Sequence, residues 1–223
     1  MTFAEGLITI YDKLDDNWRL PKDVSLIFPF SDPDVKTYLN AFYSRYFNDN
    51  KKRFFLFGIN PGRFGAGLTG VPFTDPVILQ ERCDISNNAV KKNELSSAFI
   101  YEMIDYLGGL EFFYSRFYIS SVCPLGFIKS GKNYNYYDDQ ELLNATIPYI
   151  IKWIDDQLNL PHFSNKAFSL GQGKNYKFLN KLNNDHGWFD EIIPLPHPRW
   201  VMQYRRKFKN IYLDEYQQKL VVG

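Results

Sequence analysis

Asn60 stands in a loop rich in glycine and proline, which reads Gly-Ile-Asn-Pro-Gly from Gly58 and continues to Phe73. Glycine lets the backbone come close to a flat ligand, and proline stiffens the loop so that its amides keep their direction. Asn60 offers a polar amide that has no useful proton affinity, and Phe73 offers an aromatic face. Each residue alone is more simply interpreted as part of a turn or core, but together they indicate a binding loop.

His197 is the second residue whose side chain could take part in a reaction. Of the three histidines in the chain, it is the one that follows an apolar run and lies between two prolines, Pro196 and Pro198. A histidine in such a place, taken alone, is more often structural than functional. Because Asn60 also follows an apolar run, the two residues together favour a functional role for His197.

Four short apolar runs must position these side chains. They lack the alternation of a half-buried strand, which predicts strands buried on both faces of a parallel sheet. The expected strands cover residues 53–59, 117–122, 167–170 and 191–195. Ligands of open parallel sheets bind beyond the carboxyl ends of the strands. The residues found at those ends are Asn60, Ser121, Gly171 and His197.

Helical patterns alternate with these runs and predict helices on both faces of the sheet. One helix is expected over 95–107, and a longer one after Asp138 and Glu141, which have the spacing of a capping box. Residues 1–50 are expected to form a mainly helical lead-in to an α/β core over 51–223. The predicted fold is a three-layer α/β/α domain over 1–223 with a central, mainly parallel four-stranded sheet.

Composition is that of an ordinary globular protein of 223 residues, with 45% hydrophobic residues, 23% charged residues and a net charge of +1. The charge is unevenly spread, because residues 192–213 contain five basic side chains and no acidic one. Such a stretch is usually a solvated face, but it could also contact phosphates. No run approaches membrane-spanning length, and the two cysteines are too few for a disulfide framework, so a cytoplasmic location is expected.

The loop from Gly58 closely resembles the first motif of the uracil-DNA glycosylase superfamily. It is most similar to the single-strand-selective monofunctional (SMUG) branch, which reads Gly-Met-Asn-Pro-Gly-x-Phe-Gly and runs on to Thr-Gly-Val-Pro-Phe. This chain has Ile59 in place of the methionine and matches the rest of the fixed positions through Phe73. So long an ungapped match implies excision of damaged bases from DNA.

Two further segments resemble motifs of the same branch but depart from them. His197 begins His-Pro-Arg-Trp where the superfamily has His-Pro-Ser-Pro, and two residues are missing from the loop that follows. Residues 118–133 resemble, more weakly, a motif that reads Phe-Val-x-Asn-x-Cys-Pro-Leu and then Ser-Gly-Arg-Asn. This chain keeps Cys123-Pro124-Leu125 and has Ser130-Gly131-Lys132-Asn133, but Ser121 takes the place of the asparagine that reads the base. A hydroxyl is shorter than an amide and cannot pair with both a donor and an acceptor at once.

The resemblance implies a monofunctional, metal-independent hydrolase of the N-glycosidic bond, acting on uracil or related deaminated bases flipped out of DNA. Asn60 would orient water toward the sugar, and His197 would stabilise the negative charge of the departing base. The residues expected to bind the base are Gly58, Ile59, Gly62, Phe64, Gly65, Phe73 and Ser121. Those expected to bind DNA are Lys132, Lys174, Arg199, Trp200, Met202, Arg205, Arg206 and Lys207.

Arg199, Trp200 and Met202 stand in an expected loop and are candidates for a wedge that holds the DNA open after base flipping. Packing of Trp200 into the core is an equally good interpretation. No cofactor is expected, and the protein is expected to act as a monomer.

Two other functions remain open from the sequence. Ser121 and the shortened loop after His197 are compatible with a DNA-binding module that has a degenerate pocket. A nucleotide hydrolase is suggested only by the phosphate-loop spacing of residues 126–133, which ends in Asn133 where a magnesium ligand needs a hydroxyl. The two glycines at Gly171 and Gly173 make a still weaker dinucleotide signal.

Overall fold

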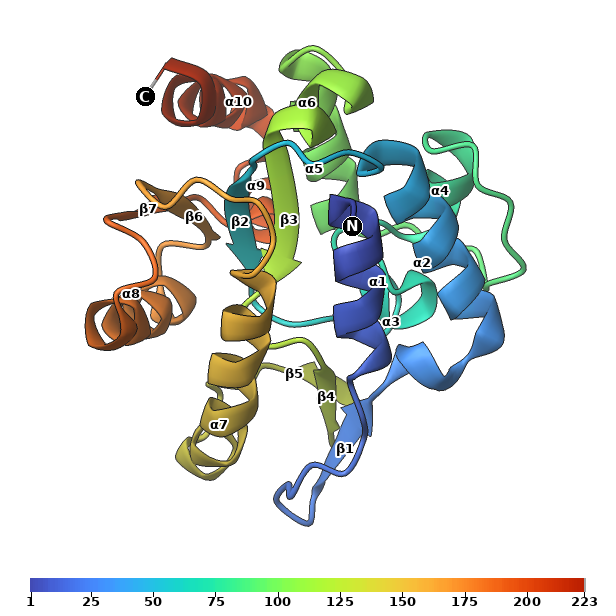
Figure 1. Cartoon of the computed structure of the whole chain (residues 1–223), viewed down its shortest axis with the longest axis vertical. Coiled ribbons are helices and arrows are strands. Elements are labelled where there is room, and N and C mark those ends of the chain that lie inside the picture. Colours follow the sequence, from blue (N-terminus) through green and yellow to red (C-terminus); the bar gives the residue numbers. More distant parts are fainter. Residues whose placement is uncertain (223) are drawn as a thin grey trace.

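The computed structural model describes residues 1–222 and has a sheet of four parallel strands at its centre (Figure 1). The strand order is β3-β2-β6-β7. The strands are β2 (Phe54–Gly58), β3 (Phe117–Ser121), β6 (Ala167–Leu170) and β7 (Ile192–Leu195). All four predicted strands are therefore confirmed, as is the three-layer α/β/α class. The register pairs Gly58 of β2 with Ser121 of β3, so their carboxyl ends are level.

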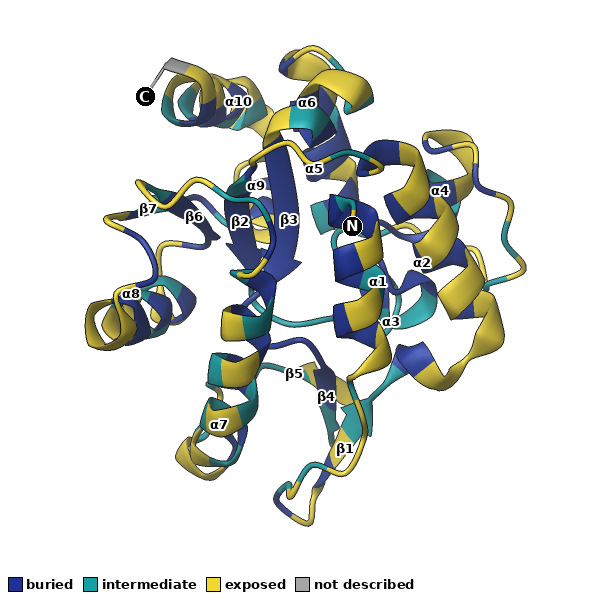
Figure 2. Cartoon of the chain, viewed as in Figure 1, coloured by how far each residue is buried: buried dark blue, intermediate teal, exposed yellow. Residues whose placement is uncertain are grey.

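Helices cover both faces of this sheet, as the alternating pattern predicted. One layer contains α1 (Phe3–Asp12), α2 (Pro33–Tyr46) and α7 (Gln140–Gln157), and the other contains α5 (Leu95–Tyr106), α9 (Pro198–Tyr204) and α10 (Lys209–Gln217). The remaining helices are α3 (Ala66–Thr69), α4 (Pro76–Glu81), α6 (Leu110–Arg116), α8 (Lys174–His186), the 3₁₀ turns η1 (Pro29–Ser31) and η2 (Arg206–Phe208), and the π-helical turn η3 (Gln218–Val222). Figure 2 shows that the central strands are buried while the helices are exposed on their outer sides.

The structure adds a second sheet, one strand of which lies within the first 50 residues. It consists of three antiparallel strands in the order β1-β4-β5: β1 (Val24–Ile27), β4 (Gly126–Lys129) and β5 (Lys132–Tyr134). The lead-in is thus helical except for β1, whose four residues are too few for a sequence signal. The phosphate-loop spacing at 126–133 is a β-hairpin, with Ser130 and Gly131 in left-handed conformations at its turn. This geometry places no helix N-terminus where a phosphate loop needs one.

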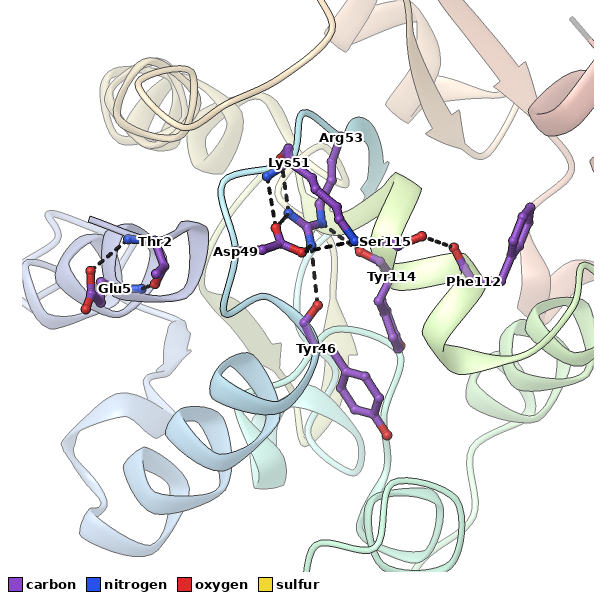
Figure 3. A network of polar contacts seen from close by, with 9 residues as sticks. All are labelled: Thr2, Glu5, Tyr46, Asp49, Lys51, Arg53, Phe112, Tyr114 and Ser115. Atoms are coloured by element: carbon purple, nitrogen blue, oxygen red, sulfur yellow. Dashed lines mark hydrogen bonds and ion pairs between the residues drawn. The ribbon is translucent and has the colours of Figure 1, made fainter.

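The amino-terminal end of β2 is anchored by a buried cation (Figure 3). The Arg53 guanidinium donates to both carboxylate oxygens of Asp49, at 2.8 and 3.1 Å, and to the carbonyl oxygens of Tyr46, Lys51 and Tyr114. A buried charge needs such complete pairing, because an unpaired one costs several kcal/mol (about 3–5) when its partner is removed. This network fixes where β2 begins, at the end of the strand opposite Asn60.

The start of α7 also differs from the prediction by one residue. Asp139, not Asp138, is the N-cap, and its carboxylate accepts a hydrogen bond from the Leu142 N–H at 2.7 Å. Asp138 instead accepts from the Asn135 N–H at 2.8 Å and closes the turn before the helix. The two neighbouring aspartates have equal capping propensity, but Asp139 also accepts hydrogen bonds from Lys129 Nζ and the Tyr134 hydroxyl, each at 3.2 Å.

Candidate active site

A cavity of about 720 Å³ opens at the carboxyl ends of the central strands. Three of the residues predicted from separate strands line it: Asn60 after β2, Ser121 at the end of β3, and His197 after β7. Gly171, after β6, packs behind the His197 ring; a Cβ added to it would lie 3.7 Å from the His197 Cδ2 atom. The topology thus brings together side chains that lie far apart in the sequence.

Asn60 is held in one orientation by backbone groups. Its Nδ2 donates to the carbonyl oxygens of Pro61 and Tyr134, each at 3.3 Å, and its Oδ1 accepts from the Tyr136 N–H at 3.2 Å. Because Nδ2 faces two acceptors and Oδ1 faces a donor, an amide with Oδ1 and Nδ2 exchanged would lose all three hydrogen bonds. The second lone pair of Oδ1 remains to accept a hydrogen bond, so Asn60 can orient a water molecule but cannot take its proton.

His197 is a neutral hydrogen-bond donor. Its Nδ1 accepts from the Arg199 N–H at 3.1 Å, which caps α9 and leaves the proton on Nε2. Burial, reinforced by the positive charge of Arg199, lowers the pKa of His197 from 6.5 to about 4. The imidazole therefore stays uncharged near neutral pH and offers an N–H to the cavity. On the other side of this strand end, the Tyr216 hydroxyl donates to the Pro196 carbonyl oxygen at 2.5 Å.

Phe73 forms an aromatic wall next to His197, with the two ring centroids 6.4 Å apart. Its backbone adopts φ 53°, a left-handed conformation that an aromatic residue rarely takes. The ring packs directly on Gly58, where an added Cβ would approach Phe73 Cε2 to 2.6 Å. Glycine at this strand end is therefore required for the Phe73 ring to come so close to the backbone.

Ser121 lines the cavity but uses its hydroxyl hydrogen within the protein. Its Oγ donates to the Cys123 carbonyl oxygen at 2.7 Å, and only 8% of the residue is exposed. The hydroxyl can then act toward a ligand only as an acceptor, for example of an imide N–H. The Ser121 carbonyl oxygen accepts from Trp153 Nε1 at 2.9 Å, which ties the end of β3 to α7.

The glycine loop is folded back on itself after Asn60. The Gly67 N–H donates to the Gly62 carbonyl oxygen at 2.9 Å, and the Arg63 N–H donates to Asn133 Oδ1 at 3.3 Å. Ile59, Gly62 and Phe64 line the cavity as predicted. Gly65 does not, because the carboxylate of Glu94 covers it and occupies the space that a side chain at Gly65 would take.

The DNA-binding residues predicted from the sequence fall into three groups. Arg199 and Lys132 line the cavity mouth. Lys174, Arg205, Arg206 and Lys207 are exposed but lie away from its walls. Met202 is only 8% exposed, so its assignment as a wedge is wrong. The reason is that residues 198–204 form helix α9 and not a loop, and Met202 belongs to the buried side that packs on α5.

Trp200 lies on the outer side of α9 and is 40% exposed. Its ring meets the Tyr212 ring edge-on at a centroid distance of 5.8 Å, and the Arg205 guanidinium lies 5.3 Å from it. Of the two interpretations left open by the sequence, burial beneath a helix is excluded. An exposed aromatic surface next to basic side chains remains.

Several cavity residues were not found from the sequence. Glu94, at the N-cap of α5, brings a carboxylate to the wall, and Asn133 of the hairpin brings an amide. Arg63 places its guanidinium over the Phe64 ring at 4.5 Å and donates to the Gly131 carbonyl oxygen at 2.7 Å. Asn133 stood in a segment that resembles a family motif, but nothing near Glu94 distinguished it from an ordinary first residue of a helix.

Comparison with known proteins agrees with this geometry. A family model described as the Uracil DNA glycosylase superfamily matches residues 44–221, which include every cavity residue discussed above. The chain therefore belongs to the uracil-DNA glycosylase superfamily. It is a monofunctional DNA glycosylase, a hydrolase acting on N-glycosyl bonds in base excision repair.

A solved structure places it more closely within that class. The crystal structure of wild-type Pedobacter heparinus SMUG2 is 45% identical in sequence, superposes with a TM-score of 0.93, and is matched over 97% of this chain and 95% of that chain. The SMUG-like assignment from the first motif is thereby confirmed. No curated protein matches the chain. Among residues 1–222, none of the helices combines the length and the hydrophobicity of a membrane-spanning segment.

Proposed function

We propose that this glycosylase removes uracil and related deaminated bases from DNA, with Asn60 and His197 as its catalytic residues. The observation that carries the proposal is the meeting of Asn60, Ser121 and His197 at one cavity, with His197 held as a neutral donor and Asn60 held in a single amide orientation. Monomeric action and a cytoplasmic location, both expected from the sequence, are part of the proposal.

The proposed reaction begins with a base stacked on Phe73. As the N-glycosidic bond breaks, the bonding electrons leave with the base and the sugar becomes an oxocarbenium-like cation. The Nε2–H of His197 donates to the base oxygen on which the negative charge develops, and such a fixed donor contributes roughly 3 kcal/mol to the transition state. A water molecule that hydrogen-bonds to Asn60 Oδ1 attacks the sugar C1′ and gives an abasic site.

A release assay in chelator tests the activity. A DNA strand that contains uracil, hypoxanthine, xanthine or hydroxymethyluracil is incubated with the protein and EDTA, and free base is measured, together with alkali-labile sites in the strand. We expect free uracil to be released without alkali, and we expect strand breaks to form only after alkali is added. Failure to release any of the four bases would refute the proposed range of substrates, whereas breaks that need no alkali would indicate a different reaction.

Neutralising Arg205, Arg206 and Lys207 together should weaken binding to damaged and undamaged DNA equally. These side chains are exposed beyond α9 and precede α10, so they are placed to contact phosphates and not base edges. Each lost phosphate contact should reduce the slope of log K against log salt by roughly 1, giving about 3 in total.

A matched control neutralises Lys51, Lys52 and Arg116, which are exposed near the starts of β2 and β3, at the edge of the sheet away from the cavity. This control should keep the wild-type slope. Equal slopes for both triple variants would show that the basic stretch is a solvated surface.

Ser121→Asn should shift the preference of the enzyme from xanthine toward uracil. In the wild type, the Ser121 hydroxyl donates to the Cys123 carbonyl oxygen, so toward the base it can only accept a hydrogen bond. It can therefore pair with the imide N–H of uracil but leaves the neighbouring carbonyl oxygen of the base without a partner. An unsatisfied group in a closed pocket costs about 1–3 kcal/mol, and an asparagine amide would restore the paired donor and acceptor. The measurement is the ratio of single-turnover rates on uracil and xanthine.

Ser121→Ala is the control for this substitution, because it removes the hydroxyl without adding an amide. It should lower both rates and leave the uracil preference no higher than in the wild type. A ratio that is the same in all three proteins would show that Ser121 does not touch the base.

A further inference from the structure

Glu94 is the one acidic residue among the described residues that line the cavity. Its backbone N–H donates to Asp75 Oδ2 at 2.9 Å, and Asp75 Oδ1 accepts from the N–H groups of Val77 and Ile78 at the start of α4. The buried Asp75 carboxylate therefore fixes the starts of both α4 and α5. This leaves the Glu94 side chain free of any role in capping its own helix.

The Glu94 carboxylate lies against the glycine loop that follows Asn60. Its Oε1 is 3.5 Å from the position of a Cβ added to Gly62, and its Oε2 would overlap a Cβ added to Gly65. Within the described residues, the one hydrogen bond of Glu94 outside its helix that involves a side chain is the one its backbone N–H donates to Asp75, and its carboxylate forms neither a hydrogen bond nor a salt bridge. Burial raises the pKa of this carboxyl, opposed by the charge of Arg199 and reinforced by that of Asp75.

Keeping a carboxylate partly desolvated without a partner costs free energy, and ionisable groups of this kind are concentrated at functional sites. The proposed reaction has a step that no other described group lining the cavity supplies. Water that adds to C1′ must lose a proton, and Asn60 cannot accept it. His197 cannot accept it either, because its Nδ1 is already bonded to the Arg199 N–H and its pKa is about 4.

We propose that Glu94 faces the cationic sugar and accepts the proton of the attacking water, directly or through a second water, over the glycines at positions 62 and 65. This proposal rests on the proposed function. The C1′–N bond breaks with its electron pair going to the base, and the C1′–O bond forms from a water lone pair. The water proton passes to the Glu94 carboxylate and from there to solvent. Gly65 is needed because a side chain there would overlap the Glu94 carboxylate and separate it from the loop.

The pH dependence of the single-turnover rate tests this role. As pH falls through the pKa of Glu94 the carboxylate takes up a proton and can no longer accept one, so the wild-type rate should fall on the acidic side. Glu94→Gln should lose about 10²-fold, at the lower end of general-base contributions, and should lack the acidic decline. The charged groups that face Glu94 are Asp75 and Arg199, with Lys132 at the cavity mouth, and they remain in the variant.

Glu81→Gln is the matched control, because Glu81 is an exposed glutamate at the end of α4 and does not line the cavity. It should keep both the rate and the pH profile of the wild type. A Glu94→Gln enzyme with the wild-type rate, or one whose rate still declines on the acidic side, would overturn the proposal. A merely structural role of Glu94 would lower the rate equally at every pH.

A binding experiment separates failure of this proposal from failure of the proposed function. The probe is a DNA strand with a pyrrolidine in place of the sugar, which carries a positive charge near the position of C1′ and needs no turnover. The wild type should bind it more tightly than a strand with a neutral abasic analogue, and this preference should rise with pH as Glu94 ionises. In Glu94→Gln the preference for the charged strand should fall about 10-fold, which corresponds to the loss of ~1.4 kcal/mol of attraction between two charges. An unchanged preference in Glu94→Gln would contradict the placement of Glu94 at the sugar, even in a protein that releases no base.

Discussion

Asn60→Ala should reduce the single-turnover rate of base release by about 10³-fold or more while DNA affinity stays near that of the wild type. Orientation of a reactant can be worth far more than this, and it acts on the transition state without strengthening ground-state binding. The structure gives the reason for the size of the effect. The Asn60 amide is fixed by Tyr134, Tyr136 and Pro61 backbone groups, so its Oδ1 is preorganised to hold water.

The same contacts require a control for folding, because Asn60 also links the end of β2 to Tyr134 of β5 and to Tyr136 just after it. The urea midpoint and the affinity for undamaged DNA should therefore be measured for Asn60→Ala and for Asn159→Ala, which alters an exposed asparagine after α7. Asn60→Ala that is folded, binds DNA and retains a near-normal rate would show that Asn60 is only a structural link.

Most of the sheet could be predicted because its strands are buried on both faces. Each central strand is a short apolar run, and a run of that kind is visible without knowledge of its neighbours. The run Phe54–Phe57 ends at Gly58 and the next polar side chain is Asn60, so the end of the strand and the start of the site were both visible. Parallel topology then placed the strand ends together.

The small sheet could not be predicted, because its strands depend on one another. The hairpin strands β4 and β5 become recognisable only when β1, about 100 positions earlier in the sequence, pairs with β4. Its turn at Ser130 and Gly131 resembled a phosphate loop in spacing alone. The use of Asp139 and not Asp138 as helix cap was likewise not visible locally, because Asp139 is also bonded to Lys129 and Tyr134 of the hairpin.

The site shows the same division. Asn60, Ser121 and His197 were predicted because each follows a strand, whereas Met202 was wrongly assigned because the segment after His197 was taken for a loop. Pro198 in fact occupies the first position of α9, where its missing N–H is not needed. Glu94 reaches the cavity from a helix on one face of the sheet, so its contribution depends on tertiary packing.

His197→Ala should lower the single-turnover rate by about 10²–10³-fold, the cost of removing one preorganised donor to a developing negative charge. The effect should be nearly constant above pH 5, because burial and Arg199 hold the pKa of His197 at about 4 and the ring stays neutral. His197→Gln offers an amide donor in a similar place and should recover part of the lost rate. Equal rates for the wild type and His197→Ala would refute the assignment.

The depressed pKa of His197 also predicts how the stability of the protein depends on pH. The unfolded chain binds a proton at this histidine near pH 6.5, whereas the folded protein does so only near pH 4. The contribution to stability is therefore present above pH 6.5 and is lost as pH falls toward 4, at ~1.4 kcal/mol for each pH unit at most. His197→Ala should reduce stability at pH 7, because it removes the cap of α9 and leaves a space beside Phe73, and its stability should fall less steeply between pH 6.5 and 4. Urea unfolding at pH 7 and pH 5 measures both differences. Identical pH dependence in the wild type and His197→Ala would mean that His197 is solvated in the folded state and is not the neutral donor on which the mechanism depends.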